Sequence, residues 1–417
     1  MAITLHPLYN SRMEILIDSI SDSLCAVALD KGHKLEAVEI DPELEQVRHG
    51  TIYMGRIDRI DATENTAYID IGNNLQGFLN AKDARHLGNK TDKSLSQWLN
   101  NGDLVIVQAQ DGAVMPRSHA YDDYEDKHVR LTMDITLHGR FTLYAPYRKD
   151  NKISRRIDDK QRRAHLKDMM DKEDMQGTVL RAASTMLQND MILREYKLLR
   201  KIWLAVLESL PTANTARPIL AGPNAMMRML ANQAMNTIER IEICGEDYFD
   251  LTQTWCMQFA PDLVNKLVFS DIKETSRDAD RLFEFRGVLT PIEDLYRPYC
   301  VLDNGSSIII EETAALTAVD VNRGAADGSR LDVNIYTAKE IMRQIRLRNL
   351  SGIIIIDFLK MKNDDERKKF TKLVKDLART DPYTVQVHGL TKLGLMELTR
   401  ARRTPPLADK LDLVINS

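Results

Sequence analysis

The residues best suited to chemistry are two aspartates and an asparagine in the last quarter of the chain. Leu316–Asn322 alternates apolar and polar residues as a strand does, which places Asp320 and Asn322 on one face. The continuous apolar run Ile353–Ile356 is typical of a strand covered on both faces, and it ends in Asp357. Either aspartate alone could be a turn or cap residue. Two of them beside an asparagine favour a functional site.

A helix is predicted between these two strands, over Ile335–Asn349, because apolar residues recur there at helical spacing. Strands that flank such a helix run parallel, so their carboxyl ends lie at one edge of the sheet, where open α/β sheets bind ligands. Asp320 and Asp357 should therefore meet. Carboxylate and amide oxygens suit Mg²⁺ or Mn²⁺ rather than zinc.

A second unit of the same kind is expected to follow. Asn363 or Asp364 is suited to cap a helix that runs to about Arg379. The alternating segment Tyr383–His388 then predicts a third strand, which would place His388 at the same edge of the sheet.

Three strings resemble the catalytic core of the ribonuclease E/G family: LTAVDVNRG, KEIMRQIRLRNLSGIIIIDFLKM and VHGLTKLGLMELTRARRTPP. A weaker resemblance extends from about Met13 to Leu407. It implies that Asp320 and Asp357 bind a catalytic Mg²⁺ ion and that Asn322 assists at the scissile phosphate. It also implies cleavage of single-stranded RNA to 5′-phosphate and 3′-hydroxyl products.

Further candidates for RNA contact come from the basic residues. Arg343, Arg346 and Lys392 could hold the RNA backbone, since cations suit phosphate, and His388 could orient a metal ligand or a phosphate. Each of the four could equally be structural. Nearer the N-terminus, Arg59 could contact a phosphate or belong to the solvated surface.

The composition is that of an ordinary soluble protein, with 417 residues, 43% hydrophobic and 28% charged, and a formal net charge of −4. No apolar run reaches the ~18 residues of a membrane helix, and the N-terminal residues lack the pattern of a secretory signal. The four cysteines form no CxxC pair, so reduced thiols are expected. We therefore expect a cytoplasmic protein whose RNA contacts depend on local basic charge.

Gly50 to about Arg130 is predicted to form an OB-type barrel, because short strands alternate there with turn residues. The string resembles the RNA-binding OB-fold of the same family, whose aromatic positions on the RNA face match Tyr68 and Phe78. An aromatic ring there stacks a base for ~1–3 kcal/mol. Alternation alone leaves open that both rings pack in the barrel core. Asp111 stands near a position where the family usually has lysine, which would weaken phosphate contact.

The next region resembles the part of the family that senses the RNA 5′ monophosphate. Arg155 and Arg156 follow a predicted strand and could bind phosphate or be an exposed basic segment. The family's pocket uses an arginine and a threonine in succession, with a glycine on the preceding strand. Here Arg181 matches the arginine, but Ala182 replaces the threonine, and His128 stands near the glycine position. A lost hydroxyl donor and added bulk both disfavour a phosphate, so weak or absent 5′-end sensing is predicted.

The resemblance implies a multidomain α+β and α/β fold in which a ribonuclease-H-like subdomain is interrupted by two inserted regions. The expected parts are the ribonuclease-H-like subdomain (13–48 and 213–285), an OB-fold RNA-binding domain (49–130), a 5′-sensor-like region (131–212), a DNase-I-like α/β catalytic subdomain (286–405) and a tail (406–417).

The expected function is Mg²⁺-dependent cleavage of single-stranded RNA by an endoribonuclease, in rRNA or tRNA processing or in mRNA decay. The family normally continues with a CxxC motif that shares zinc between two subunits. That motif is absent from this sequence, so no zinc is expected and a homodimer would form through the catalytic subdomain instead. Two alternatives stay open: a catalytically weak or inactive RNA-binding protein of the same fold, and a Mg²⁺ phosphohydrolase that acts on small substrates.

Overall fold

The computed structural model describes residues 12–42, 47–84, 94–112, 129–210, 214–270, 272 and 281–415. The chain divides into two compact units. The first comprises Met1–Pro42, Asn236–Gln253 and Asn265–Ser417, and the second comprises Glu43–Met235 and Thr254–Val264. The first unit is therefore assembled from segments far apart in the sequence. Within the described ranges, no helix is long and apolar enough to cross a membrane.

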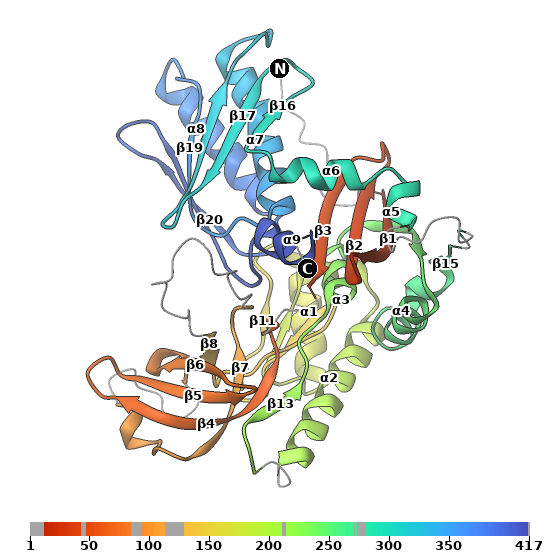
Figure 1. The fold of residues 1–417 in the computed structure, drawn as a ribbon, viewed down its shortest axis with the longest axis vertical. Coiled ribbons are helices and arrows are strands. Elements are labelled where there is room, and N and C mark those ends of the chain that lie inside the picture. The colour runs from red at the N-terminus through yellow and green to blue at the C-terminus, as the bar shows by residue number, and fades with distance from the viewer. Residues whose placement is uncertain are drawn as a thin grey trace. The chain divides into compact units, whose positions relative to one another are not determined.

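The first unit contains a five-stranded sheet built from both sides of the inserted segment. Its strands and accompanying helices are β1 (Arg12–Ile20), β2 (Ser23–Asp30), β3 (Leu35–Asp41), β14 (Thr237–Ile243), β15 (Leu267–Phe269), α5 (Arg281–Phe285), α6 (Leu289–Glu293) and α9 (Leu407–Ile415), together with the part of α4 (Glu246–Phe259) that precedes Thr254. The strand order is β15-β14-β1-β2-β3, and β1 pairs with β14 in parallel (Figure 1). The centre of β1 is buried on both faces, and its residues Ile15, Leu16 and Ile17 form a continuous apolar run.

The second sheet of this unit has six strands and carries the predicted aspartates. Its elements are β16 (Tyr299–Val301), β17 (Ser307–Glu312), β18 (Thr317–Asn322), β19 (Gly352–Asp357), β20 (Val385–Leu390), β21 (Met396–Arg400), α7 (Arg330–Leu347) and α8 (Asp364–Ala378). The strand order is β16-β17-β18-β19-β21-β20. The predicted parallel pairing of β18 with β19 is confirmed.

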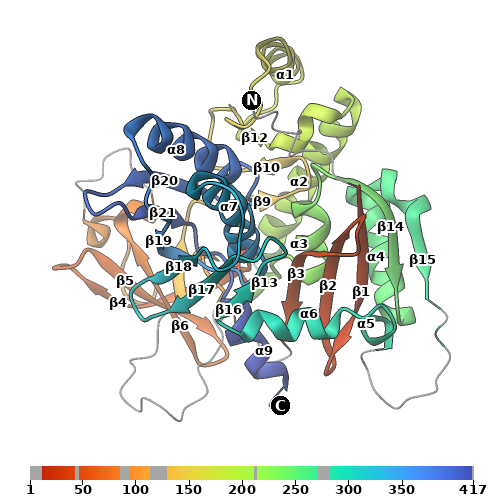
Figure 2. The ribbon, with the colours of Figure 1, turned by 90° about the horizontal axis from the view of Figure 1, so that it is seen from above.

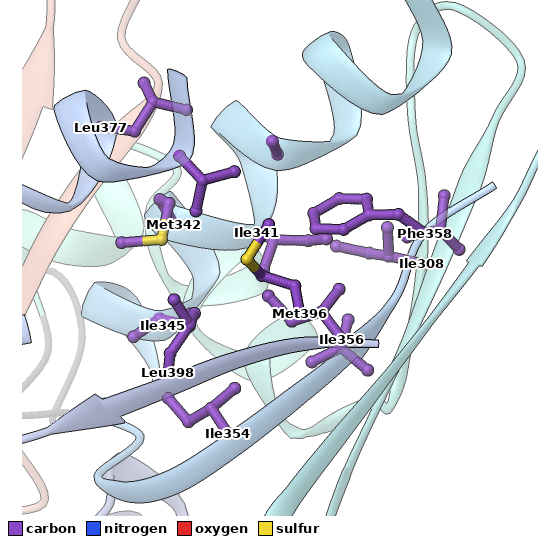
Figure 3. Packing of buried hydrophobic residues seen from close by; sticks show 14 of the residues in the cluster. Ile308, Ile341, Met342, Ile345, Ile354, Ile356, Phe358, Leu377, Met396 and Leu398 are labelled. Atoms are coloured by element: carbon purple, nitrogen blue, oxygen red, sulfur yellow. The ribbon is translucent and has the colours of Figure 1, made fainter. Parts of the chain in front are cut away.

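Helices α7 and α8 cover one face of this sheet (Figure 2). Ile308, Ile354 and Leu398 of the strands belong to one apolar cluster with Ile341 and Ile345 of α7 (Figure 3). Since strand residues alternate between faces, the residues between these buried positions lie on the opposite face. That face carries Asp320, Asn322 and Asp357.

The sequence located these helices well because their ends are set locally. Asn363 caps α8 by accepting a hydrogen bond from the Glu366 backbone N–H at 2.9 Å. Helix α7 begins before the predicted Ile335, because Ser329 and Asp332 form a capping box one turn earlier. Both expected helices are therefore present.

The second unit contains a closed barrel. Its strands are β4 (Ile52–Asp61), β5 (Thr66–Gly72), β6 (Leu75–Asn80), β7 (Leu104–Ala109) and β8 (Val129–Thr132), with β13 (Arg217–Leu220) added to β4. Each strand bonds to the next in the order β4-β5-β6-β8-β7, and β7 pairs with β4 to close the ring. Ile57, Ile69 and Leu79 fill the interior. The expected OB-like barrel is confirmed.

A smaller sheet and helices complete the second unit. They are β9 (Leu137–His138), β10 (Thr142–Tyr144), β11 (Lys152–Ile153), β12 (Thr178–Leu180), α1 (Lys160–Lys172), α2 (Asn189–Ser209) and α3 (Ala225–Asn232), and the strand order is β11-β12-β10-β9. Glu195 of α2 is buried and accepts hydrogen bonds from the backbone N–H groups of Arg140, Phe141 and Thr142 and from the Thr142 hydroxyl, at 2.6 to 2.9 Å. Burial raises the pKa of Glu195, and these four donors oppose that shift. Gly139 is required beside it, because a Cβ there would lie 2.5 Å from the Glu195 carboxyl carbon. This carboxylate is therefore structural.

Candidate active site

Asp320 and Asp357 lie side by side at the ends of two parallel strands. They are direct partners in the register of β18 and β19, and both are exposed. Asn322, on the same face, donates a hydrogen bond from Nδ2 to Asp320 Oδ2 at 2.8 Å. Two residues distant in sequence thus meet as the strand–helix–strand pattern predicted.

The donor set suits a hard divalent cation. Among the residues that the structure describes, no group of three or more His, Cys, Asp and Glu side chains could hold a metal. Mg²⁺ does not need such a cage, because it retains several waters and binds through one or two carboxylates together with substrate phosphates. Asn322 donates one of its two side-chain N–H groups to Asp320 Oδ2, and this bond orients the carboxylate. Oδ1 of Asp320 takes no part in that hydrogen bond. The residues present therefore fit Mg²⁺ better than zinc.

The expected third strand is present as β20, and it runs parallel to β19, so His388 near its C-terminal end lies at the edge that carries Asp357, as predicted. β21 separates β20 from β19, so the expected third strand is not a neighbour of the Asp357 strand. The exposed His388 ring is hydrogen bonded through Nε2 to Thr399 Oγ1 at 3.1 Å. Since Ile356 pairs with Met396, the β20–β21 turn lies at the edge that carries Asp357, and Lys392 is exposed in that turn. Lys392 is thus better placed than His388 for contact with a phosphate at this edge.

Arg343 and Arg346 are engaged with the first sheet of the same unit. Arg343 forms ion pairs with Glu36 Oε1 at 3.1 Å and with Glu340 Oε1 at 2.7 Å, and it donates to the Leu35 carbonyl. Arg346 lies 3.6 Å from Glu36 Oε2. Burial raises the pKa of Glu36, whereas the two guanidinium groups lower it. These contacts favour the structural alternative for both arginines, because their charge is already used within the fold.

A row of aromatic and cationic side chains crosses the outside of the barrel. In the strand register Arg59 pairs with Tyr68, Tyr68 with Phe78, and Phe78 with Arg130. The Arg59 guanidinium lies 3.8 Å from the centroid of the Tyr68 ring, a cation–π contact. Arg130 is held by a hydrogen bond from Nε to the side chain of Gln110.

Tyr68 and Phe78 are half-buried, and the residues that alternate with them fill the barrel interior. The alternative that both rings pack in the core is therefore wrong, and both lie on the outer face. Sequence reasoning missed Arg130, because only the pairing of β8 with β6 brings it into this row. The alternation of Val129, Arg130 and Leu131 was the available signal.

Three arginines gather at the ends of two parallel strands in the second unit. β11 pairs in parallel with β12, and Arg155, Arg156 and Arg181 follow the last paired residues. Arg155 is exposed and Arg156 is half-buried. Arg181 donates from Nη1 to the Gly139 carbonyl at 2.8 Å, and its neighbour Ala182 is buried. His128, near the predicted glycine position, lies outside the described residues.

Comparison with known proteins gives these surfaces a context. The model of the ribonuclease E/G family matches residues 136–403. The chain belongs to the ribonuclease E/G family. Membership makes it an endoribonuclease of the ribonuclease E/G type.

Individual ribonuclease E/G relatives match along nearly the whole chain. Ribonuclease G of Haemophilus influenzae is 28% identical over 404 residues, which is 93% of this chain and 79% of the relative. Ribonuclease G of Escherichia coli is 27% identical over 404 residues, and the match again covers 93% of this chain and 79% of the relative. Ribonuclease E of Haemophilus influenzae is 26% identical over 410 residues, covering 95% of this chain and 42% of the relative. The similarity therefore extends beyond the segment matched by the ribonuclease E/G model, into the barrel.

Proposed function

We propose that this chain cleaves single-stranded RNA with the help of Mg²⁺ bound at the edge of the six-stranded sheet. The observation that carries the proposal is the direct pairing of Asp320 with Asp357, with Asn322 bonded to Asp320. Membership of the ribonuclease E/G family makes RNA the substrate class.

Asp320 and Asp357 would hold the ion through their carboxylate oxygens. When bound, such an ion lowers the pKa of a coordinated water and neutralises charge on phosphate oxygens. Asn322 keeps one N–H on Asp320 and has a second N–H for a phosphate oxygen or a water. Its role is to fix the direction of the Asp320 carboxylate and the position of the scissile phosphate.

The outer row of the barrel would bind the RNA strand. Tyr68 and Phe78 offer faces on which bases stack, and Arg59 and Arg130 at the two ends of the row offer cations to the backbone. Stacking accepts any base, so this surface would supply affinity with little sequence preference. Arg155, Arg156 and Lys392 are further candidates for phosphate contact.

The finer division of the fold belongs to the same proposal. The five-stranded sheet would be the ribonuclease-H-like subdomain, the small four-stranded sheet with α1 the 5′-sensor-like region, and the six-stranded sheet with α7 and α8 the DNase-I-like catalytic subdomain. We further propose action in the cytoplasm on rRNA or tRNA precursors or on mRNA, and a homodimer formed through the catalytic subdomain without a zinc link.

The test is cleavage of a short end-labelled, A/U-rich single-stranded RNA, with Mg²⁺ and with EDTA. The parent protein and Asp357→Asn are compared, and circular dichroism confirms that both are folded. Internal cuts that need both Mg²⁺ and Asp357 are expected. Tight, salt-sensitive binding without any cuts would instead identify an RNA-binding protein without catalysis and overturn the proposal.

A further inference from the structure

A tyrosine shares the cross-strand row of the two aspartates. Tyr299 of β16 pairs with Ile309 of β17, Ile309 pairs with Asp320, and Asp320 pairs with Asp357. Directly paired residues lie on the same face of a sheet, so Tyr299 shares the face of the aspartates. Two strand spacings separate it from Asp320, which is roughly 10 Å.

The exposure of this tyrosine is unusual for its position. Tyr299 is 52% exposed and Val301, two residues on, is 71% exposed, although both lie in an edge strand of a folded sheet. Ile309, between Tyr299 and Asp320, is half-buried and forms an apolar floor. Edge strands usually carry charge or proline rather than exposed apolar side chains, so such a surface indicates a binding role.

We propose that the Tyr299 ring is the platform for a base next to the scissile phosphate. This inference rests on the proposed function, since it needs RNA at the aspartate pair. An RNA strand that places a phosphate at Asp320 and Asp357 and runs along the row crosses Ile309 and then reaches Tyr299. The ring then stacks one base of the flanking nucleotide and fixes the register of the strand at the site.

RNA is favoured over a second copy of the chain as the occupant of this surface. The row is continuous with the aspartate pair. A nucleotide has a flat base and a phosphate, which suit the aromatic ring and the neighbouring phosphate site respectively. A contact between copies would not require the tyrosine to stand in the row of the aspartates.

The first experiment places a single abasic nucleotide at successive positions around the cleavage site of a single-stranded RNA. For the parent, we expect kcat/KM to fall roughly 5- to 150-fold at one flanking position. Tyr299→Ala should show a loss of similar size on intact RNA and no additional loss from the abasic nucleotide at that position. Tyr299→Phe should behave as the parent, because the ring is retained. Tyr336→Ala, which removes a tyrosine that is 38% exposed on α7, is the matched control and should cleave normally.

The second experiment reads stacking without cleavage. RNA with 2-aminopurine at the same flanking position is bound to Asp357→Asn, and its fluorescence should be quenched. Adding Tyr299→Ala to Asp357→Asn should remove the quenching. If quenching depends on Tyr299 but the parent does not cut RNA, the stacking of a base on Tyr299 is retained and only the cleavage in the proposed function is overturned.

Three results would overturn the inference. One is that Tyr299→Ala and Tyr336→Ala cleave alike. Another is that Tyr299→Ala and the abasic nucleotide lower kcat/KM independently at every position, so that their combined effect is the product of the two separate effects. The third is that Tyr299→Ala changes the molecular mass measured by light scattering, which would assign the surface to a contact between copies.

Discussion

Two rows of side chains, one in each unit, are assembled in the same way and are suited to different tasks. On the six-stranded sheet, Asp320 and Asp357 are exposed carboxylates with one short hydrogen bond from Asn322. On the barrel, Tyr68 and Phe78 are half-buried rings flanked by Arg59 and Arg130. The first row offers oxygens that can still accept ligands, whereas the second offers flat apolar faces and fixed cations.

The comparison shows that the same kind of cross-strand pairing can form either a catalytic site or an RNA-binding surface, depending on the side chains that it aligns. Carboxylates repel phosphate, so the acidic row needs a cation before RNA can approach, and it should govern turnover. The aromatic row needs no cofactor and should govern affinity. Changes in one row should therefore leave the property of the other row intact.

The largest effect is expected from the acidic row. Asp320→Asn should lower kcat by at least about 100-fold, since it removes one of two carboxylate ligands to the ion. The dissociation constant for RNA and the melting temperature should stay near the parent values, because Asp320 is exposed. Single-turnover kinetics and filter binding measure the two quantities. Glu311→Gln, on an exposed carboxylate of the same sheet, is the control; equal losses in both variants would refute the assignment.

The aromatic row should show the opposite pattern. Tyr68→Ala should raise the dissociation constant for single-stranded RNA roughly 5- to 150-fold, because a stacked base is lost. The rate at saturating RNA should be unchanged, and Tyr68→Phe should retain most of the affinity. A fall in the saturated rate without a change in affinity would break the comparison.

Arg343 and Arg155 test which arginines stabilise the fold and which bind RNA. Arg343→Ala should destabilise the protein by about 2 kcal/mol, because Glu36 and the Leu35 carbonyl lose their donor. RNA affinity should not change.

Arg155→Ala should weaken RNA binding without changing stability, and it should lower the magnitude of the salt slope of RNA binding by about 0.7. Urea unfolding and salt titrations decide the matter, and weaker RNA binding by Arg343→Ala would return that residue to the RNA surface.

The smallest effect concerns the RNA 5′ end. The rate ratio between 5′-monophosphorylated and 5′-hydroxyl RNA should be near one. Ala182 is buried and has no hydroxyl, and Arg181 already donates to the Gly139 carbonyl. Cleavage of two matched RNAs that differ only at the 5′ group measures the ratio. A strong preference for the monophosphate would show that phosphate is recognised by other residues.

Much of the acidic site could be predicted from the sequence because its determinants are local. The apolar run of β19, the alternation of β18 and the Asn363 cap of α8 each depend on neighbouring residues. A short strand–helix–strand connection leaves few topologies, so the meeting of Asp320 and Asp357 followed. The start of α7 was placed late because the capping box of Ser329 and Asp332 was not recognised, although Leu331 continues the apolar spacing.

Other features depended on pairing between distant segments. His388 lies at the predicted edge of the sheet, but nothing local in Tyr383–His388 shows that β21 lies between β20 and β19. The helical spacing of Arg343 predicted which face of the helix it occupies. It did not predict the ion pair with Glu36, which lies on β3 and is far away in the sequence.

The sequence by itself determined which segments are strands and helices, which faces are apolar, and that two aspartates end parallel strands. These properties follow from side-chain alternation, capping and apolar runs, which act over a few residues. Only the tertiary structure decided that Arg130 joins the barrel row, that Arg343 and Arg346 are bound by Glu36, and that Tyr299 stands in line with the aspartates. The physical reason is that strand register and ion pairing are set by residues from different parts of the chain, whose energies no local pattern contains.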